Sequence, residues 1–295
     1  MSSEAQFAAA GLADSLLGGG DDFSLAAERA PLPQRATVIA LVGMAFEARI
    51  AAAPGVLVFS RNAQRELALA VDDAARLGCR GIISFGVAGG LAGGLQTGDW
   101  IVASAVFESQ VVRATDKAWS SELLDALGSA AAYAPIVGVD TPIAEPAIKR
   151  DLYRTTGAAA VDMESHIVAR LAATHGLAFA ALRVVVDPAD RAIPSSALMG
   201  MGAGTGGRAD GLAVLRELLA QPSQLSRLVR ISLDALVART EMQRVRRLVG
   251  PHFGLTGIAQ PARTGLAPDL APDLAPGLAE DKPAQADAAV YRSLA

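Results

Sequence analysis

The chain has 295 residues, of which 52% are hydrophobic and 19% are charged, so apolar side chains suffice for one sizeable core. The net charge of −4 and the 4% of aromatic residues argue against a basic, base-stacking surface; we therefore expect no nucleic-acid partner and favour a small polar ligand. Cys79 is the only cysteine, which excludes an internal disulfide and any metal site built from several thiolates.

The two ends of the chain differ from the middle in composition. Residues 1–35 are rich in Ala, Gly and acids, and residues 254–295 repeat a Leu-Ala-Pro unit whose prolines disfavour helices and central strands. We expect a disordered N-terminal arm, one folded domain over residues 36–253, and a disordered Pro/Ala-rich tail. The N-terminal arm lacks the pattern of a secretory signal, and no apolar run approaches the roughly 20 residues of a membrane span. We therefore expect a cytoplasmic protein.

Within the folded part, short apolar runs alternate with helical patterns. Strands are predicted at 37–43, 55–59, 80–86, 100–107, 133–139, 158–161 and 177–187, and helices at 62–77, 120–130, 144–154 and 162–176. Residues 87–99 are predicted to form a glycine-dense turn. The alternation predicts an α/β fold around a largely parallel or mixed sheet.

Beyond residue 187 the pattern changes. A glycine-rich segment at 200–211 precedes two predicted helices, at 212–219 and 223–250. The second helix is basic, since between residues 223 and 249 six arginines minus two acids give +4. Such a helix can lie on an anionic membrane, which would make the protein peripheral at the inner membrane. An arginine-studded helix that packs on its own domain explains the pattern equally well.

Three acidic residues lie where predicted strands end or give way to helices. Cleavage of a ribosyl C–N bond needs an acid for the departing base, groups that hold the ribose hydroxyls, and a nucleophile on the opposite face. Asp187 ends the strand 177–187, at the edge where open α/β sheets bind ligands, and in protonated form it can give its proton to N7 of adenine. The ordinary alternative is a turn or helix-capping carboxylate, because Asp before Pro commonly opens a turn.

The other two acids suit the sugar side of such a reaction. Glu164 can accept two ribose hydroxyl hydrogen bonds, or it is merely a first-turn acid favoured by the helix dipole. Met163 beside it is either a core residue or a sugar contact. Glu47 is placed to activate a water or to repel a phosphate, or else it is a solvated acid paired with Arg49.

Three segments carry a family resemblance: VGMAFEA (42–48), ISFGVAGGLAGGLQTGDWIVAS (83–104) and AVDMESHIVARLAATHGLAFAALRVVVDPAD (160–190). They resemble the successive motifs of the purine nucleoside phosphorylase and methylthioadenosine/S-adenosylhomocysteine nucleosidase superfamily. The resemblance covers about residues 36–190. It implies a single-domain, nucleoside phosphorylase-like α/β fold, with a twisted mixed sheet surrounded by helices, and a homo-oligomer.

The same resemblance implies roles for particular residues. Asp187 would protonate the purine, Glu164 and Met163 would bind the ribose, and Glu47 would activate water. The glycine-rich motif would bind the substrate through Gly86, Val87, Ala88 and Gly89, with the last two lining the base pocket. No metal and no organic cofactor is expected, because His166, His175 and His252 are scattered along the chain; phosphate would be a co-substrate.

A narrower similarity is to the hopanoid-associated phosphorylases. It rests on VGMAFEARIA (42–51), SFGVAGGL (84–91), VVDPAD (185–190) followed by a glycine-rich segment, and the arginine-rich end. It implies removal of adenine from adenosylhopane, an adenine nucleoside linked to a lipid, which yields ribosylhopane or its phosphate in hopanoid biosynthesis. Two alternatives stay open: a methylthioadenosine/S-adenosylhomocysteine nucleosidase, and a non-catalytic nucleoside-binding protein.

The chain departs from the better-known branches of the superfamily at several positions. Bacterial purine nucleoside phosphorylases place an arginine and a serine for phosphate in the glycine-rich motif, where this chain has Ser84 and Val87. The nucleosidases stack an aromatic ring on adenine, where this chain offers Pro142. Arg49 and Arg113 are the candidates that the sequence leaves for a phosphate site.

Overall fold

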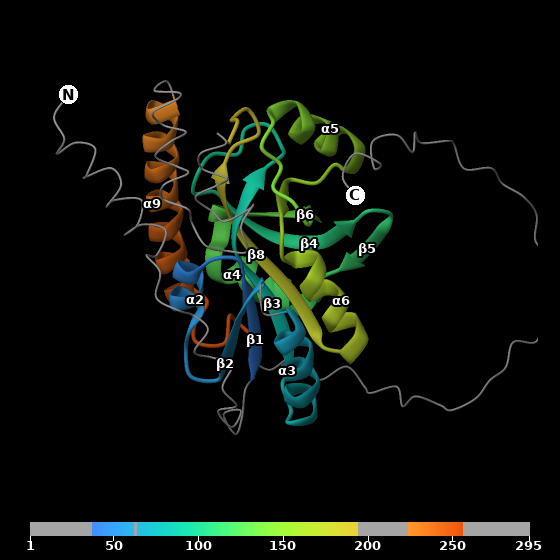
Figure 1. Cartoon of the computed structure of the whole chain (residues 1–295). Helices are drawn as coiled ribbons and strands as arrows, with labels where there is room; N and C mark the ends of the chain where they lie inside the picture. The colour runs from blue at the N-terminus through green and yellow to red at the C-terminus, as the bar shows by residue number, and fades with distance from the viewer. Residues whose placement is uncertain (1–36, 62–63, 194–223, 256–295) are drawn as a thin grey trace, which may run out of the picture.

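The computed structural model describes residues 37–61, 64–193 and 224–255. The arm at 1–35, the glycine-rich segment at 200–211, the predicted helix at 212–219 and the tail from residue 256 lie outside the described residues. Within them, eight strands form one mixed sheet with helices on both of its faces (Figure 1). The predicted α/β fold with a mixed sheet surrounded by helices is therefore confirmed.

The described elements follow the predicted alternation closely. The strands are β1 (Val38–Val42), β2 (Val56–Ser60), β3 (Gly81–Gly90), β4 (Trp100–Glu108), β5 (Val111–Ala114), β6 (Ala131–Gly138), β7 (Ala160–Asp162) and β8 (Ala178–Asp187). The helices are α2 (Ala45–Ala51), α3 (Gln64–Arg76), α4 (Lys117–Leu127), α5 (Pro146–Thr156), α6 (Ser165–His175) and α9 (Gln224–Leu248), with a 3-10 turn, η3, at Gly128–Ala130. Gly176 ends α6 in a left-handed conformation, as predicted.

Three differences from the predicted elements are corrections. Residues 87–90 continue strand β3 and do not belong to a turn. The short edge strand β5 and the helix α2 were not predicted as separate elements. Glycine is a poor strand former, so the glycine-rich motif predicts a turn as long as the side chains that pack against it are unknown.

The strand pairings close into a circuit. β3 pairs with β8 in parallel, β8 with β4 antiparallel, β4 with β6 in parallel, β6 with β7 in parallel, and β7 with β3 antiparallel. β1 and β2 extend the sheet beyond β3, and β5 pairs with β4. Because β3 and β8 run side by side in the same direction, the ends of both strands lie at one edge of the sheet.

Both faces of the sheet are buried. In β1 the residues Val38, Ala40 and Val42 point to the face that is covered by α2, α4 and α9, whereas Ile39 and Leu41 point to the face that is covered by α3 and α6. Figure 1 shows α9 and α2 on one side of the sheet and α3 and α6 on the other. Burial on both faces explains why β1, β3 and β8 appear in the sequence as continuous apolar runs.

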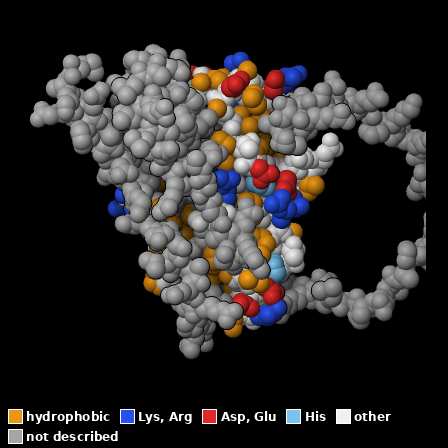
Figure 2. All heavy atoms as spheres, in the orientation of Figure 1, with side chains coloured by type: hydrophobic (Ala, Val, Ile, Leu, Met, Phe, Trp, Pro, Cys, Tyr) orange, Lys and Arg blue, Asp and Glu red, His pale blue; other side chains and the backbone are white. Residues whose placement is uncertain are grey.

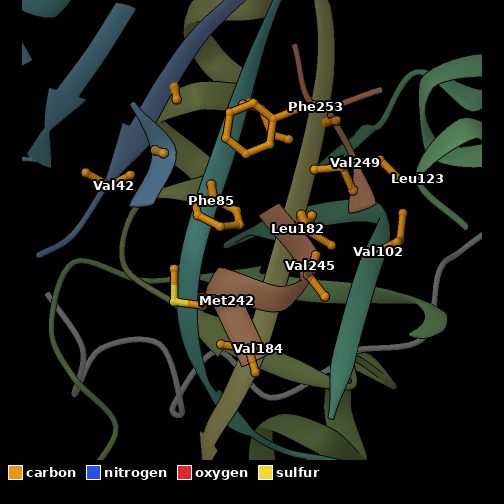
Figure 3. Packing of buried hydrophobic residues seen from close by; sticks show 14 of the residues in the cluster. Val42, Phe85, Val102, Leu123, Leu182, Val184, Met242, Val245, Val249 and Phe253 are labelled. Carbon is orange, nitrogen blue, oxygen red and sulfur yellow. The ribbon is translucent and has the colours of Figure 1, made fainter. Parts of the chain in front are cut away.

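Helix α9 packs on its own domain. Met242 and Val245 of this helix, and Val249 just after it, lie in one hydrophobic cluster with Phe85 and Leu182 of the sheet (Figure 3). The predicted basic surface of this helix is also reduced, because the Arg246 guanidinium is buried. It donates hydrogen bonds to the carbonyls of residues 51, 250 and 251 and lies 4.1 Å from the ring centroid of Phe253.

The described surface is mixed in charge. On the face drawn in Figure 2, acidic and basic side chains lie near one another among apolar ones. None of the described helices is long and apolar enough to cross a bilayer.

Candidate active site

Glu47 is buried at the start of α2. Its side chain is 1% exposed, and its Oε2 accepts hydrogen bonds from the backbone N–H groups of Gly43 (2.7 Å) and Met44 (2.8 Å). Oε1 accepts a third hydrogen bond, of 2.8 Å, from the Val87 N–H of β3. Glu47 is therefore not a solvated helix acid paired with Arg49, which is exposed on α2. Burial raises the pKa of Glu47, while Arg183 and the three N–H donors act in the opposite direction.

A buried cation, Arg183, lies at the centre of the acidic residues. It is 0% exposed in the middle of β8, and its Nε lies 2.5 Å from Asp162 Oδ2. Its Nη1 lies 3.4 Å from Glu164 Oε2, and its Nη2 donates to Ser84 Oγ. Arg183 was not among the predicted site residues. An arginine inside an apolar strand is nevertheless an available signal, because arginine is almost never fully buried unless it is paired.

Glu164 lies between two arginines and two acids. It is the residue before α6 and is 7% exposed, with Arg61 Nε 3.7 Å from its Oε1. Burial raises the pKa of Glu164 to about 7; Arg183 lowers it, whereas the nearby carboxylates of Asp162 and Glu47 raise it. Met163, the neighbouring residue, is half-buried.

The structure brings Glu47 and Glu164 together at Gly43. A Cβ atom added to this glycine would lie 2.9 Å from Glu164 Oε1 and 3.4 Å from Glu47 Oε2. The two carboxylates thus flank the same backbone position, and they are the two that the resemblance assigns to the ribose and to the activation of water.

Asp187 ends β8 at a bulge. Ala88 of β3 pairs with Val185, but the next residue, Gly89, pairs with Asp187, so one residue of β8 is left over. Bulges of this kind redirect side chains beside functional sites. The Asp187 side chain is 13% exposed, and a Cβ atom on Gly89 would lie 3.2 Å from its Oδ2.

A lysine that was not among the predicted site residues binds Asp187. Lys149 Nζ, from α5, lies 2.5 Å from Asp187 Oδ2, and the lysine is 0% exposed. Burial raises the pKa of Asp187, and the charge and hydrogen bond of Lys149 lower it. Asp187 is therefore more than a helix cap or a turn carboxylate.

The glycine-rich end of β3 connects the two acidic sites. A Cβ atom on Gly86 would lie 2.5 Å from Glu47 Oε1, and Gly89 contacts Asp187. Three residues of strand separate these glycines by on the order of 10 Å. The Ala88 side chain packs in the hydrophobic core, so only its backbone is available to a ligand. Glycine is needed here because the carboxylates approach the strand closely.

The sequence candidates for a phosphate site lie elsewhere. Arg113 Nη1 binds Glu108 Oε2 at 2.8 Å beside the edge strand β5, and Arg49 is on the exposed side of α2. Among the residues that the structure describes, Arg61 and Arg183 are the arginines bound to the acidic cluster, and Arg183 already binds two carboxylates.

The scattered histidines are not gathered by the fold into a metal centre. His166 Nε2 lies 3.1 Å from Asp140 Oδ1, whereas His252 lies against Gly55 at the far end of β1 and β2. In the described part of the chain, no group of three or more His, Cys, Asp or Glu side chains is arranged to hold a metal ion.

No curated protein sequence matches the chain. Among solved structures, the futalosine hydrolase of Helicobacter pylori strain 26695 has 14% identity and a TM-score of 0.47, over 70% of this chain and 96% of that one. The 5′-methylthioadenosine/S-adenosylhomocysteine nucleosidase from Neisseria meningitidis, in complex with methylthio-immucillin-A, has 16% identity and a TM-score of 0.49, over 71% of this chain and 98% of that one.

The family comparison is more specific. The model of the phosphorylase superfamily matches residues 60–199, a range that contains β3, β8, Glu164, Asp187 and Arg183. This match confirms the predicted class of enzyme at the level of the superfamily. Over residues 60–199, the chain is therefore similar to the phosphorylase superfamily.

Proposed function

We propose that the protein cleaves the N-glycosidic bond of an adenine nucleoside. The observation that carries this proposal is the pair of carboxylates at the two ends of one short piece of β3, with the buried Glu47 against Gly86 and the largely buried Asp187 against Gly89. Such a reaction needs an acid on the side of the base and an activated nucleophile on the side of the sugar. Glu164, beside Glu47, supplies acceptors for ribose hydroxyls between them.

In this proposal each carboxylate has one role. Protonated Asp187 gives its proton to N7 of adenine as the bond between C1′ and N9 breaks, so that adenine leaves as a neutral base. Glu47 takes a proton from the attacking water, whose oxygen forms the new bond to C1′. Burial favours these two roles, because it raises the pKa values of Asp187 and Glu47 and so brings their proton exchange nearer to neutral pH.

Water is favoured over phosphate as the nucleophile. The cluster around Arg183 has three acidic groups, Glu47, Glu164 and Asp162. Its two cations are Arg183 and Arg61. An excess of carboxylate repels a phosphate dianion. Phosphorolysis would require a cationic site from residues outside this cluster.

For the identity of the nucleoside we propose adenosylhopane, on the strength of the sequence resemblance to hopanoid-associated phosphorylases. An apolar 5′ substituent would need an apolar surface near the site. The exposed apolar side chains Leu233, Val237 and Leu248 on α9 are candidates for such a surface, or for peripheral contact with the inner membrane of the cell. Sedimentation with anionic liposomes, compared with neutral ones, tests the membrane contact; equal partitioning would exclude it.

The deciding experiment is release of adenine by the full chain from adenosylhopane and from methylthioadenosine, each with and without phosphate. Release from adenosylhopane that does not depend on phosphate is the expected result. Activity on methylthioadenosine alone would exclude the lipid-linked substrate and would indicate the housekeeping nucleosidase reaction. Dependence on phosphate would exclude Glu47 as the base that activates water, and release from neither substrate would refute the proposed function for these nucleosides.

Gly86→Ala is expected to impair this activity. The new methyl group would lie 2.5 Å from Glu47 Oε1 and 2.9 Å from Arg183 Nη1, so the carboxylate must shift. A displacement of about 1 Å in a catalytic group costs on the order of 100-fold in rate. Gly93→Ala is the matched control, because a Cβ atom there meets nothing within 4 Å. Equal kcat/KM for the two variants would show that Glu47 does not depend on close contact with β3.

A further inference from the structure

The surroundings of Lys149 are unusual for a lysine. The side chain is 0% exposed, and its Nζ lies 3.2 Å from the carbonyl oxygen of Asp187, 3.1 Å from that of Pro188 and 3.2 Å from that of Arg191. Carbonyl oxygens only accept hydrogen bonds, so they bind the ammonium form with its three donors. The shortest contact, at 2.5 Å, is to the Asp187 carboxylate.

These contacts order the segment that follows β8. The ammonium group joins the residues 187–191 to α5, and the Ile193 N–H donates to the carbonyl of Ala144, just before that helix. Because Oδ2 of Asp187 is bound by Lys149, the carboxyl group has a fixed orientation and Oδ1 remains for a ligand.

We propose that Lys149 is a positioning residue for Asp187, which orients the carboxyl group and makes it a stronger acid toward the departing base. The inference deepens the proposed function and rests on it. When Asp187 gives up its proton, a carboxylate forms against a preformed ammonium group, so the interaction is stronger after proton transfer than before it. Interactions of this kind accelerate a reaction because they strengthen as charge develops.

Other charged groups near Asp187 compensate one another. The charge of Asp234, on α9, raises the pKa of Asp187, but Asp234 Oδ2 is itself bound by Arg191 Nη1 at 2.6 Å. Asp190 is exposed. Lys149 is thus the cation in direct contact with the carboxylate, and its removal is expected to raise the pKa of Asp187.

The test is a titration of the Asp187 carboxyl group by ¹³C NMR in the wild type and in Lys149→Met, with the signal assigned from Asp187→Asn. Removal of an opposite charge in contact is expected to raise the pKa of Asp187 by about one to three units. The alkaline limb of the kcat profile for adenine release should move up with it, and kcat at its plateau should fall about tenfold. Lys117→Met, at an exposed lysine, is the control and should leave both unchanged.

Two further variants separate positioning from a merely structural role. Lys149→Gln is neutral but keeps N–H donors for the carbonyl oxygens, and it replaces Lys149→Met in the titration if circular dichroism shows that the methionine variant does not fold. In an Asp187→Asn background, Lys149→Met should cause no additional loss of kcat. An unchanged titration of Asp187, or an equal loss in both backgrounds, would overturn the inference. Since the titration needs no substrate, its outcome is distinct from a failure of the proposed function.

Discussion

Asp187→Asn is expected to lower kcat for adenine release by about 10²–10⁴-fold, the usual contribution of a general acid. The amide keeps the size of the side chain, and its oxygen can still accept the hydrogen bond from Lys149, but it has no proton to give to N7. Binding of the nucleoside should therefore persist. Single-turnover adenine release and equilibrium binding of the same nucleoside measure the two effects separately.

The matched control is Asp190→Asn, which changes an exposed carboxyl group three residues away. Its kcat should equal that of the wild type. Wild-type turnover by Asp187→Asn would contradict the role of Asp187 as an acid. If the wild type binds the nucleoside but releases no adenine from any of the candidate substrates, the chain is a nucleoside-binding protein, which was the non-catalytic alternative.

Arg183→Met is expected to destabilise the folded protein by about 3–5 kcal/mol, the cost of leaving buried charges without their partner. Arg183 contacts the carboxylates of Asp162 and Glu164 and opposes the burial of Glu47. Methionine fills a similar volume without a charge, so the acids beside it lose their compensating cation. Urea denaturation monitored by circular dichroism gives the change in the free energy of unfolding.

The loss of stability in Arg183→Met should depend on pH, and the direction of this dependence identifies its cause. Below the raised pKa of Glu164, about 7 in the wild type, this acid holds a proton and needs a cation less. Its folded-state pKa lies above its value of 4.5 in the unfolded chain, so its contribution favours folding at low pH and disfavours it as pH rises toward 7. The destabilisation by Arg183→Met should thus be larger at pH 8 than at pH 5.5.

Arg154→Met is the control for this experiment. Arg154 has a side chain that is 75% exposed and pairs with Asp151 on the surface of α5, so its removal should cost less than about 1 kcal/mol. If Arg183→Met lowers the free energy of unfolding no more than this control does, or lowers it equally at both pH values, the acidic cluster does not depend on the buried arginine.

The sequence predicted the order of elements well, because the sheet is buried on both faces and its strands appear as apolar runs. It was less successful at the glycine-rich motif. The strand β3 continues through Gly90, and its glycines are explained by the carboxylates of Glu47 and Asp187, which come from other elements. Local propensity cannot register a contact between residues that lie about 40 to 100 positions apart in the chain.

The candidate site, too, was predicted only in part. Asp187, Glu164 and Glu47 were predicted from their places at strand ends, and the structure puts Glu47 and Glu164 against the same glycine. The individual roles of these residues, and those of Met163, Gly86, Val87, Ala88 and Gly89, stay predictions, as do the absence of a cofactor and the homo-oligomer. The two buried cations that bind these acids, Arg183 and Lys149, were not predicted.

By itself, the sequence determined the class of fold and the three acids, since periodicity and strand ends are properties of neighbouring residues. Only the tertiary structure decided how these acids are held. The pairing of β3 with β8 places Asp187 beside Gly89, and the packing of α5 brings Lys149 to the same carboxylate. The charge state of a buried acid depends on burial and on partners that are distant in sequence, and both arise only when the chain has folded.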